Sequence, residues 1–243
     1  MKFIMSFNTK ISIEDFKILL NDSWKTRLGE DLYERKYWEK IIEKINSSIE
    51  KGNRVIPEKS CIFLALNSFI PSKFRVLIIG QDPYPTYGFA SGFAFSINKE
   101  IKKSTRSLER IYQEIDRSFG SNMCEKNKNN GNLQPWIDQG VLLLNTVLTI
   151  GTNQDSHKNN GWEQFTGEVL KYLDNSYVFV TIAMGTDAKK VSLMYIEKNR
   201  SLVIETGHPS PVNTRTPFIG TDCFVRCNQL LLQNDLMPIQ WVF

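Results

Sequence analysis

The sequence predicts one α/β domain built around a central four-stranded, mainly parallel sheet with helices on both faces. From residue 71 onward, short apolar runs of strand length alternate with longer amphipathic segments, and such alternation is typical of parallel sheets covered on both sides. The chain has 243 residues, of which 41% are hydrophobic and 23% charged. Because this length and composition suit one folded unit, we expect a single domain over residues 1–243.

The N-terminal part of this domain, residues 1–70, is expected to be helical. Apolar side chains recur at helical spacing within residues 16–20 and again within residues 38–45. No residue pattern in this part indicates a reaction or a ligand. The sheet core and the functional site are therefore expected within residues 71–243.

Four apolar runs predict the buried strands of the sheet, and four amphipathic segments predict helices that cover it. The predicted strands are 74–79, 141–144, 177–182 and 202–204, and the predicted helices are 107–117, 162–173, 187–197 and 222–233. Two polar segments without periodicity, 122–132 and 158–161, predict exposed loops. Because a membrane-spanning helix needs roughly 18 to 20 apolar residues, these runs predict no membrane segment.

Cysteine usage and the start of the chain indicate a reducing compartment. The four cysteines, Cys61, Cys124, Cys223 and Cys227, are too few and too irregularly spaced for a disulfide framework, so we expect free thiols. The first residues lack the apolar core and the cleavage site of a secretory signal. We therefore expect a cytoplasmic protein, or a nuclear one if the source is eukaryotic or viral.

The net charge permits a polyanionic partner without identifying one. The formal charge is +4 and the isoelectric point is near 8.8, values that are compatible with nucleic-acid binding. No long run of lysine and arginine strengthens this indication. The ordinary composition and the absence of a fixed repeat argue against a disordered, coiled-coil or solenoid protein.

Polar residues flanked by glycine or proline follow most of the predicted strands. Asp82 comes directly after the first strand, Asn145 after the second, Thr186 after the third and His208 after the fourth. Ligands of open parallel sheets bind beyond the carboxyl ends of the strands. These four positions are therefore the first candidates for a functional site.

Each candidate also has an ordinary structural explanation. Asp82 precedes a proline and suits a turn, Asn145 suits the end of a strand, and a lone histidine such as His208 is usually a hydrogen-bonded structural group. Together, however, they supply a carboxylate, an amide and an imidazole at one edge of the sheet. This combination favours a site for a small planar ligand.

Four motifs, in their order along the chain, resemble those of family 1 uracil-DNA glycosylases. They are Gly80-Gln81-Asp82-Pro83-Tyr84, Gly92-Phe93-Ala94-Phe95-Ser96, Leu142-Leu143-Leu144-Asn145-Thr146 and His208-Pro209-Ser210-Pro211. Shorter segments at 107–112, 161–166 and 218–220 resemble the family as well, so the likeness covers about residues 30–243. Several long motifs in one order are far more specific than a single glycine pattern.

The resemblance implies an enzyme that hydrolyses the bond between uracil and deoxyribose in DNA, as the first step of base excision repair. The nucleotide would be flipped out of the duplex, as glycosylases require, and an abasic site would remain. Asp82 would orient the attacking water and stabilise the positive sugar, while His208 would donate a hydrogen bond to the departing uracil. The resemblance implies no metal and no organic cofactor.

The resemblance also assigns the residues that bind uracil. Asn145 would hydrogen-bond the edge of the base, because an amide offers a donor and an acceptor side by side. Phe95 would stack on the base, and the ring of Tyr84 would exclude the methyl group of thymine. Gln81 would contribute backbone or amide contacts to uracil.

Five further residues match the family's contacts to the DNA strand. Ser107, Thr186 and Ser210 would contact phosphates, and such contacts fix the register without reading the sequence. Pro211 and Val212 would follow, with Val212 as the apolar wedge that enters the minor groove in place of the flipped nucleotide. The family more often has leucine at this last position.

Four departures from the family pattern lie outside the predicted catalytic residues. Pro85 stands where many members have histidine, Met184 where tryptophan is common, and Asp155 where a histidine often stands. Residues 102–107 replace a proline-rich loop, and their three basic side chains would add attraction for phosphates.

The implied partner is uracil-containing DNA, single- or double-stranded. A small acidic inhibitor protein that mimics DNA is a possible second partner, because it would dock on the same basic cleft. The resemblance further implies a monomer, and no membrane partner is expected.

Other interpretations stay open on the residues alone. The same fold could bind uracil or DNA without catalysis, or the chain could be a metal or iron–sulfur protein, although only Cys223 and Cys227 lie near each other in the sequence. A relative that acts on mismatched or modified bases is a third possibility, against which Tyr84 with Asn145 favours uracil.

Overall fold

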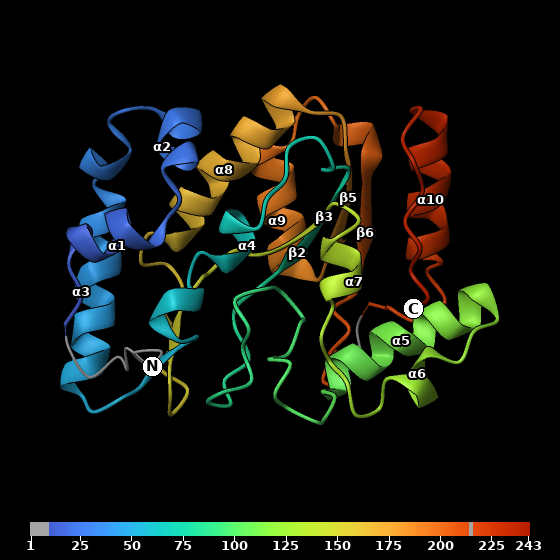
Figure 1. Cartoon of the computed structure of the whole chain (residues 1–243), viewed down its shortest axis with the longest axis horizontal. Helices are drawn as coiled ribbons and strands as arrows, with labels where there is room; N and C mark the ends of the chain where they lie inside the picture. Colours follow the sequence, from blue (N-terminus) through green and yellow to red (C-terminus); the bar gives the residue numbers. More distant parts are fainter. Residues whose placement is uncertain (1–9, 214–215) are drawn as a thin grey trace.

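The computed structural model describes residues 10–213 and 216–243, and its core is a four-stranded sheet (Figure 1). All neighbouring strands in this sheet are parallel, so their carboxyl ends lie along one edge. The prediction of an α/β fold around a parallel sheet is confirmed. The strands, in the spatial order β3-β2-β5-β6, are β2 (Val76–Gly80), β3 (Val141–Asn145), β5 (Val180–Met184) and β6 (Val203–Thr206).

The third predicted strand starts later than the apolar run suggests. Strand β5 begins at Val180, whereas the run begins at Tyr177. Tyr177 instead ends the preceding helix, where its backbone N–H donates to the carbonyl of Leu173. The end of the preceding helix and the start of β5 both pack apolar side chains into the core. Hydrophobicity alone therefore does not show where the helix ends and the strand begins.

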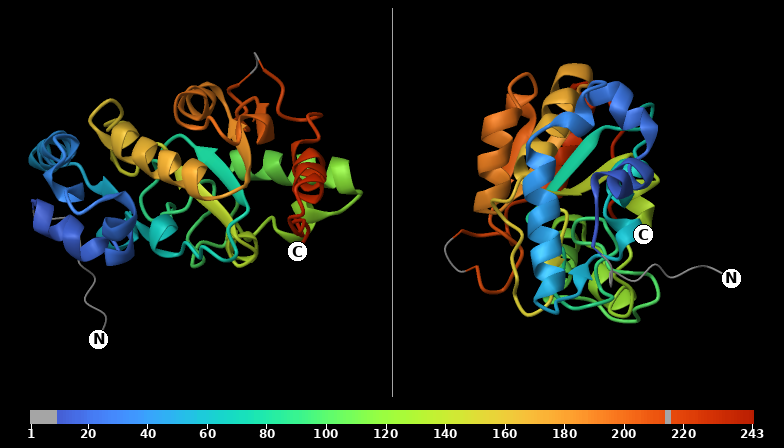
Figure 2. Two further views of the ribbon diagram at one scale, coloured as in Figure 1. Left: turned by 90° about the horizontal axis from the view of Figure 1, so that it is seen from above. Right: turned by 90° about the vertical axis from the view of Figure 1, so that its left-hand side faces the viewer.

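Side chains of successive strand residues enter two cores, one on each face of the sheet, as the pleat requires. Leu77 contributes to one core and Val76 to the other. Figure 2 shows the covering helices on the two sides, which confirms the four helices predicted in this region. The first core includes α3 (Tyr37–Glu50), α8 (Trp162–Ser176) and α9 (Thr186–Tyr195), and the second includes α5 (Arg106–Phe119) and α10 (Cys223–Gln233).

Residues 10–70 of the N-terminal part contain four α-helices, and they share the first core with the sheet, while residues 1–9 lie outside the described part of the chain. Phe16 and Trp38 of this part pack against Trp162 and Phe165 of α8, with ring centroids 5.0 to 6.2 Å apart in three of the pairs. A two-stranded antiparallel sheet, β1 (Val55–Ile56) with β4 (Ile150–Gly151), was not predicted. Each of its strands has two residues, too few to form a readable alternation. The short helices are α1 (Ile13–Leu19), α2 (Asp22–Leu28), α4 (Leu64–Asn67), α6 (Met123–Lys126) and α7 (Gln134–Ile137).

The prediction that residues 122–132 form an exposed loop was wrong in part, since residues 127–132 are not helical and residues 128–130 are exposed. This segment contains α6, and the side chains of Met123 and Asn127 are buried. The carboxylate of Asp116 accepts hydrogen bonds from the backbone N–H groups of Met123 and Cys124. Hydrogen bonds of polar groups therefore anchor the segment to α5. A prediction from composition alone assigns such a polar segment to an exposed loop.

The second predicted loop, 158–161, is a loop in the structure, although Asn159 is its one residue with an exposed side chain. All four cysteines are unpaired, as expected, and Cys223 and Cys227 are buried. Among the residues that the structure describes, no helix has the length and hydropathy needed to cross a membrane.

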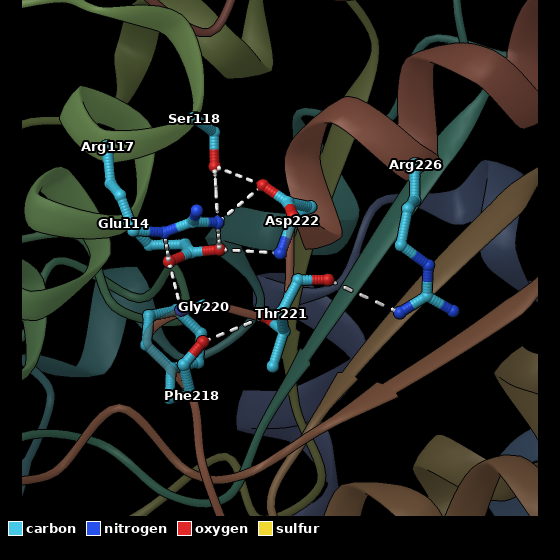
Figure 3. Close-up of polar contacts among 8 residues, drawn as sticks. All are labelled: Glu114, Arg117, Ser118, Phe218, Gly220, Thr221, Asp222 and Arg226. Carbon is cyan, nitrogen blue, oxygen red and sulfur yellow. Dashed lines mark hydrogen bonds and ion pairs between the residues drawn. The ribbon is translucent and has the colours of Figure 1, made fainter.

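A buried carboxylate joins α5 to the segment that leads into α10 (Figure 3). Glu114 is fully buried and accepts hydrogen bonds from the backbone N–H groups of Gly220 and Asp222, both at 2.7 Å. The guanidinium of Arg117 binds the same carboxylate at 3.0 and 3.1 Å. Glu114 thus fixes the end of the segment that begins at His208.

We expect Glu114→Ala to lower the free energy of unfolding by about 3 kcal/mol, because it leaves two backbone N–H donors without their acceptor and removes the buried carboxylate that binds the guanidinium of Arg117. Denaturant unfolding followed by circular dichroism measures the change. Glu109→Ala, at an exposed position of the same helix, is the matched control. Equal stability of the two variants would contradict the anchoring role.

Candidate active site

A small pocket opens at the carboxyl edge of the sheet, where β2, β3 and β6 end. Its volume is about 140 Å³, well below the roughly 300 Å³ or more of pockets for drug-sized ligands. A single small ring is therefore a suitable occupant. The lining residues include the predicted site residues Gln81, Asp82, Tyr84, Phe95, Ser107, Asn145, His208 and Ser210.

The other predicted contacts lie around this pocket. Thr186, the first residue of α9, lines an adjoining cavity of about 210 Å³ that also borders Gln81 and His208. Val212 projects from the loop after His208 with 86% of its surface exposed. Pro211 is also exposed and does not line the pocket.

Asn145 occupies the floor of the pocket because a glycine on the neighbouring strand leaves room for its side chain. Gly80 and Asn145 are paired in the register of β2 and β3. A Cβ atom at Gly80 would lie 2.3 Å from the Oδ1 atom of Asn145 and 2.9 Å from the Cβ atom of Ala94. Sequence reasoning missed this role of Gly80, although a glycine that ends an otherwise branched strand was the available signal.

We expect Gly80→Ala to lower the kcat/KM of this site by about 10- to 100-fold, because displacement of a positioned group by about 1 Å has effects of this size. Steady-state kinetics on the DNA substrate that the sequence resemblance implies measures the loss. Gly151→Ala is the control, since its Cβ atom would meet Ser48 Oγ at 2.4 Å, another side-chain oxygen. If both variants lose activity equally, the loss comes from steric strain at any added methyl group and not from displacement of Asn145.

The hydrogen bond that His208 accepts makes its Nε2 atom the donor of the neutral ring. The Nδ1 atom accepts a hydrogen bond of 2.9 Å from the backbone N–H of Ser210, so the neutral ring carries its proton on Nε2. Burial lowers the pKa of His208, and the negative charge of Asp187 partly opposes this shift. His208 is therefore neutral at neutral pH, and the ring of Phe95 packs beside it with centroids 5.9 Å apart.

The loop that carries His208 is closed by a side-chain amide that sequence reasoning missed. The Nδ2 atom of Asn213 donates to the carbonyl of His208 at 3.0 Å and to that of Thr216 at 2.8 Å. The backbone N–H of Gly207 donates to the carbonyl of Pro217 at 2.9 Å. These contacts fix the backbone of the loop and therefore the position of the His208 imidazole.

Asp82 lines the pocket and is partly exposed to solvent. The protein surrounds the carboxylate on its other sides, and this desolvation raises the pKa of Asp82. The positive charge of Lys158 lowers the pKa, whereas the negative charge of Asp187 raises it. The carboxylate is thus a stronger base than an ordinary surface aspartate, while water still reaches it.

Tyr84 and Phe95 are locked together by hydrogen bonds. The hydroxyl of Tyr84 donates to the carbonyl of Phe95 and accepts from the Oγ1 atom of Thr105, both at 2.9 Å. Burial raises the pKa of Tyr84, so the hydroxyl stays protonated. Phe95 has a φ of 62°, a left-handed conformation that is rare for a bulky residue and that often occurs at functional sites.

The segment 102–107 is held by a helix cap and by a buried side chain. Thr105 caps the start of α5 by accepting the backbone N–H of Leu108, and Ser104 is buried. Ser107 lies in the first turn of α5 and lines the pocket. The basic side chains of Lys102 and Lys103 are exposed next to it, where they can attract phosphates.

No group of three or more histidine, cysteine, aspartate or glutamate side chains with metal-binding geometry occurs within residues 10–213 and 216–243. Cys223 and Cys227 instead pack their thiols into the core beneath α10. The cavity that accepts a ligand is thus lined by a carboxylate, an amide, an imidazole and an aromatic ring.

Comparison with known proteins matches the chain to one family. A family model described as the uracil DNA glycosylase superfamily matches residues 68–232. A uracil-DNA glycosylase of Francisella tularensis subsp. tularensis is 36% identical over 221 residues, which cover 90% of this chain and 98% of the relative. The enzyme of the subspecies novicida is 35% identical over the same shares of the two chains.

Solved structures give the same result. The crystal structure of mimivirus uracil-DNA glycosylase superimposes with a TM-score of 0.81 at 25% identity, covering 96% of this chain and 90% of that one. A variant of the mimivirus protein in complex with UGI matches equally well and covers 92% of that chain. The protein from Nitratifractor salsuginis, at 19% identity and a TM-score of 0.61, shares the fold.

Proposed function

The chain belongs to the uracil-DNA glycosylase superfamily and excises uracil from DNA, and from this premise we propose how its pocket performs the reaction. Three groups of different chemistry, Asp82, Asn145 and His208, reach one small pocket from the ends of three strands. This convergence is the observation that carries the proposal. The reaction hydrolyses the bond between N1 of uracil and C1′ of deoxyribose and leaves an abasic site.

Asp82 is the proposed general base and charge stabiliser. Its carboxylate orients a water molecule toward C1′, accepts one proton from it, and stabilises the positive charge on the sugar as the bond to N1 breaks. The raised pKa of Asp82 suits proton acceptance, and its open side admits the water. The oxygen of the water becomes the new hydroxyl on C1′.

His208 is the proposed stabiliser of the leaving base. The electron pair of the broken bond leaves with uracil, whose oxygen gains negative charge. A neutral imidazole with its proton on Nε2 donates a hydrogen bond to that oxygen without giving up the proton. The hydrogen bond from Ser210 to Nδ1 supports this assignment.

Three residues are proposed to select uracil. Asn145 pairs with the edge of the base through its amide and would present the wrong donors and acceptors to cytosine. Phe95 stacks on the ring. Tyr84, held by Thr105, closes the side of the pocket where the methyl group of thymine would lie, and Gln81 adds contacts from the end of β2.

The loops around the pocket are proposed to hold the DNA strand. Ser107, Thr186 and Ser210 contact phosphates, and Pro211 presents Val212 to the minor groove. The exposure of Val212, at 86%, supports this placement because a wedge has to be free to enter the helix. Base flipping leaves a gap in the stack that an apolar side chain fills.

We expect Val212→Leu to excise uracil from duplex DNA faster than the parent, while single-stranded DNA, which needs no wedge, shows little difference. An added methylene contributes about 0.8 kcal/mol of apolar burial, or roughly a four-fold effect on flipping. Parallel assays on matched single- and double-stranded oligonucleotides measure it. The same duplex rate for both proteins would exclude Val212 as the wedge.

We further propose that a small acidic inhibitor protein docks on the DNA-binding face. The complex of a structural neighbour with UGI supports this proposal. The exposed lysines of 102–107 belong to the segment whose last residue, Ser107, lines the pocket, and they suit an acidic surface. A monomer without a membrane partner is proposed from the resemblance, and a cytoplasmic or nuclear location from the free cysteines.

The test of the proposed function is an excision assay on labelled oligonucleotides that carry one uracil, thymine or cytosine at the same position. Alkaline cleavage reports abasic sites. We expect cleavage of the uracil strand alone, in the presence of EDTA as in its absence. Cleavage of the thymine or cytosine strand would contradict the assignments of Tyr84 and Asn145.

A further inference from the structure

An ion pair that no catalytic step above uses lies beside the pocket. The Nζ atom of Lys158 and the Oδ2 atom of Asp187 are 2.7 Å apart, and their side chains are 38% and 27% exposed. Lys158 lies in the loop before α8, and Asp187 in the first turn of α9. The pair therefore ties together two segments that border the site.

Asp187 is the member of the pair that lines the adjoining cavity. It does so together with Gln81 and His208, and it follows Thr186 directly in the chain. Its carboxylate therefore shares a cavity with the residue that is proposed to stabilise negative charge on the departing base, and it neighbours a proposed phosphate contact. An unbalanced anion at this position would oppose both.

Lys158 supplies the balancing charge. Lys158 and Asp187 are the charged groups that act on Asp82, and Asp187 is the one that acts on His208. Tyr84 and Asn145, the neighbours of Asp82 across the pocket, are uncharged at neutral pH. The net charge that the two catalytic groups experience is therefore set largely by this one pair.

We propose that the Lys158–Asp187 ion pair sets the electrostatic balance of the catalytic pocket, with Lys158 neutralising Asp187 so that uracil can leave as an anion. Both are positioning residues, because they act through Asp82 and His208 and not on the substrate. The inference rests on the proposed role of Asp82. It also explains how a carboxylate is tolerated beside the phosphate contact of Thr186.

Asp82 must be ionised to act, so activity falls in acid as its carboxylate is protonated. Lys158 lowers the pKa of Asp82 and Asp187 raises it. Loss of Lys158 therefore moves the acid limb of the pH profile to higher pH, and loss of Asp187 moves it to lower pH. A purely structural or DNA-binding role of the pair predicts no such opposite shifts.

The experiment compares the parent, Lys158→Met, Asp187→Asn and the double variant in single-turnover excision from saturating single-stranded DNA across the acid range. We expect Lys158→Met to be about 10-fold slower, with its acid midpoint raised by about half a pH unit or more. Asp187→Asn should lower the midpoint, and the double variant should recover to near the parent rate. Lys25→Met, which removes the lysine of an equally short 2.7 Å pair between α2 and Glu30 in the loop after it, should change neither quantity.

Unmoved acid midpoints in both single variants would overturn the inference, as would a double variant as slow as Lys158→Met. An unchanged rate of Lys158→Met at saturating DNA would also overturn it, because an effect confined to affinity would place Lys158 on DNA instead. Asp82→Asn separates this failure from that of the proposed function. If that variant keeps the acid limb, the role of Asp82 is wrong; if it loses activity while the midpoints stay fixed, the inference alone fails.

Discussion

Replacing Asp82 with asparagine is expected to reduce the rate of uracil excision by about 10²- to 10⁴-fold, the usual contribution of a general base. The amide keeps the shape of the side chain but neither accepts a proton from water nor offsets positive charge on the sugar. Affinity for uracil-containing DNA should stay within a few-fold of the parent, because the carboxylate repels phosphates and is not needed for binding. Single-turnover rates and fluorescence-anisotropy binding measure the two quantities.

The pH profile gives an independent check of the same residue. Because desolvation raises the pKa of Asp82, the parent should lose activity in acid above the ordinary aspartate pKa of about 3.9. The remaining activity of Asp82→Asn should lack this limb. If the excision rates of the parent and of Asp82→Asn decrease at the same acid pH, the titration of a group other than Asp82 causes the decrease.

Replacing His208 with alanine is expected to slow excision by about 10²- to 10³-fold, the effect of removing one donor to a developing oxyanion. A neutral donor is enough for this role, so His208→Gln, whose amide also donates, should retain more activity than His208→Ala. Rates of the two variants at neutral pH decide the point. Equal losses would show that hydrogen-bond donation is not what His208 contributes.

The neutral state of His208 has a consequence for pH dependence. Burial lowers its pKa, so the ring stays neutral from neutral pH down to values below the ordinary histidine pKa of about 6.5. The rate of the parent should therefore be flat through that region and fall only further into acid. A rate that rises as the pH drops through 6.5 would instead indicate a cationic His208.

The sheet and its main helices could be predicted because their patterns are local. Four apolar runs marked β2, β3, β5 and β6, and the rule that ligands bind at the carboxyl edge led to Asp82, Asn145 and His208 before the fold was known. The pocket then brings those three residues together. The family's motifs added Tyr84 and Phe95, which local patterns alone would have placed in the core.

The features that were missed depend on contacts between distant segments. The hydrogen bond from Thr105 to Tyr84 joins residues 21 positions apart, and the Lys158–Asp187 pair spans 29. Gly80 owes its role to a neighbour on another strand. In segment 122–132, the acceptor that anchors a polar stretch is Asp116 of the preceding helix. The periodicity of a local segment does not indicate which distant residues it contacts.

The central claim is that three strand ends form one uracil pocket, and the most direct test is a crystal structure of the protein with free uracil. We predict that the base lies between Phe95 and the strand ends, with its edge on the amide of Asn145 and an oxygen within hydrogen-bond distance of His208 Nε2. Uracil bound elsewhere, or turned so that Asn145 does not contact it, would contradict the account.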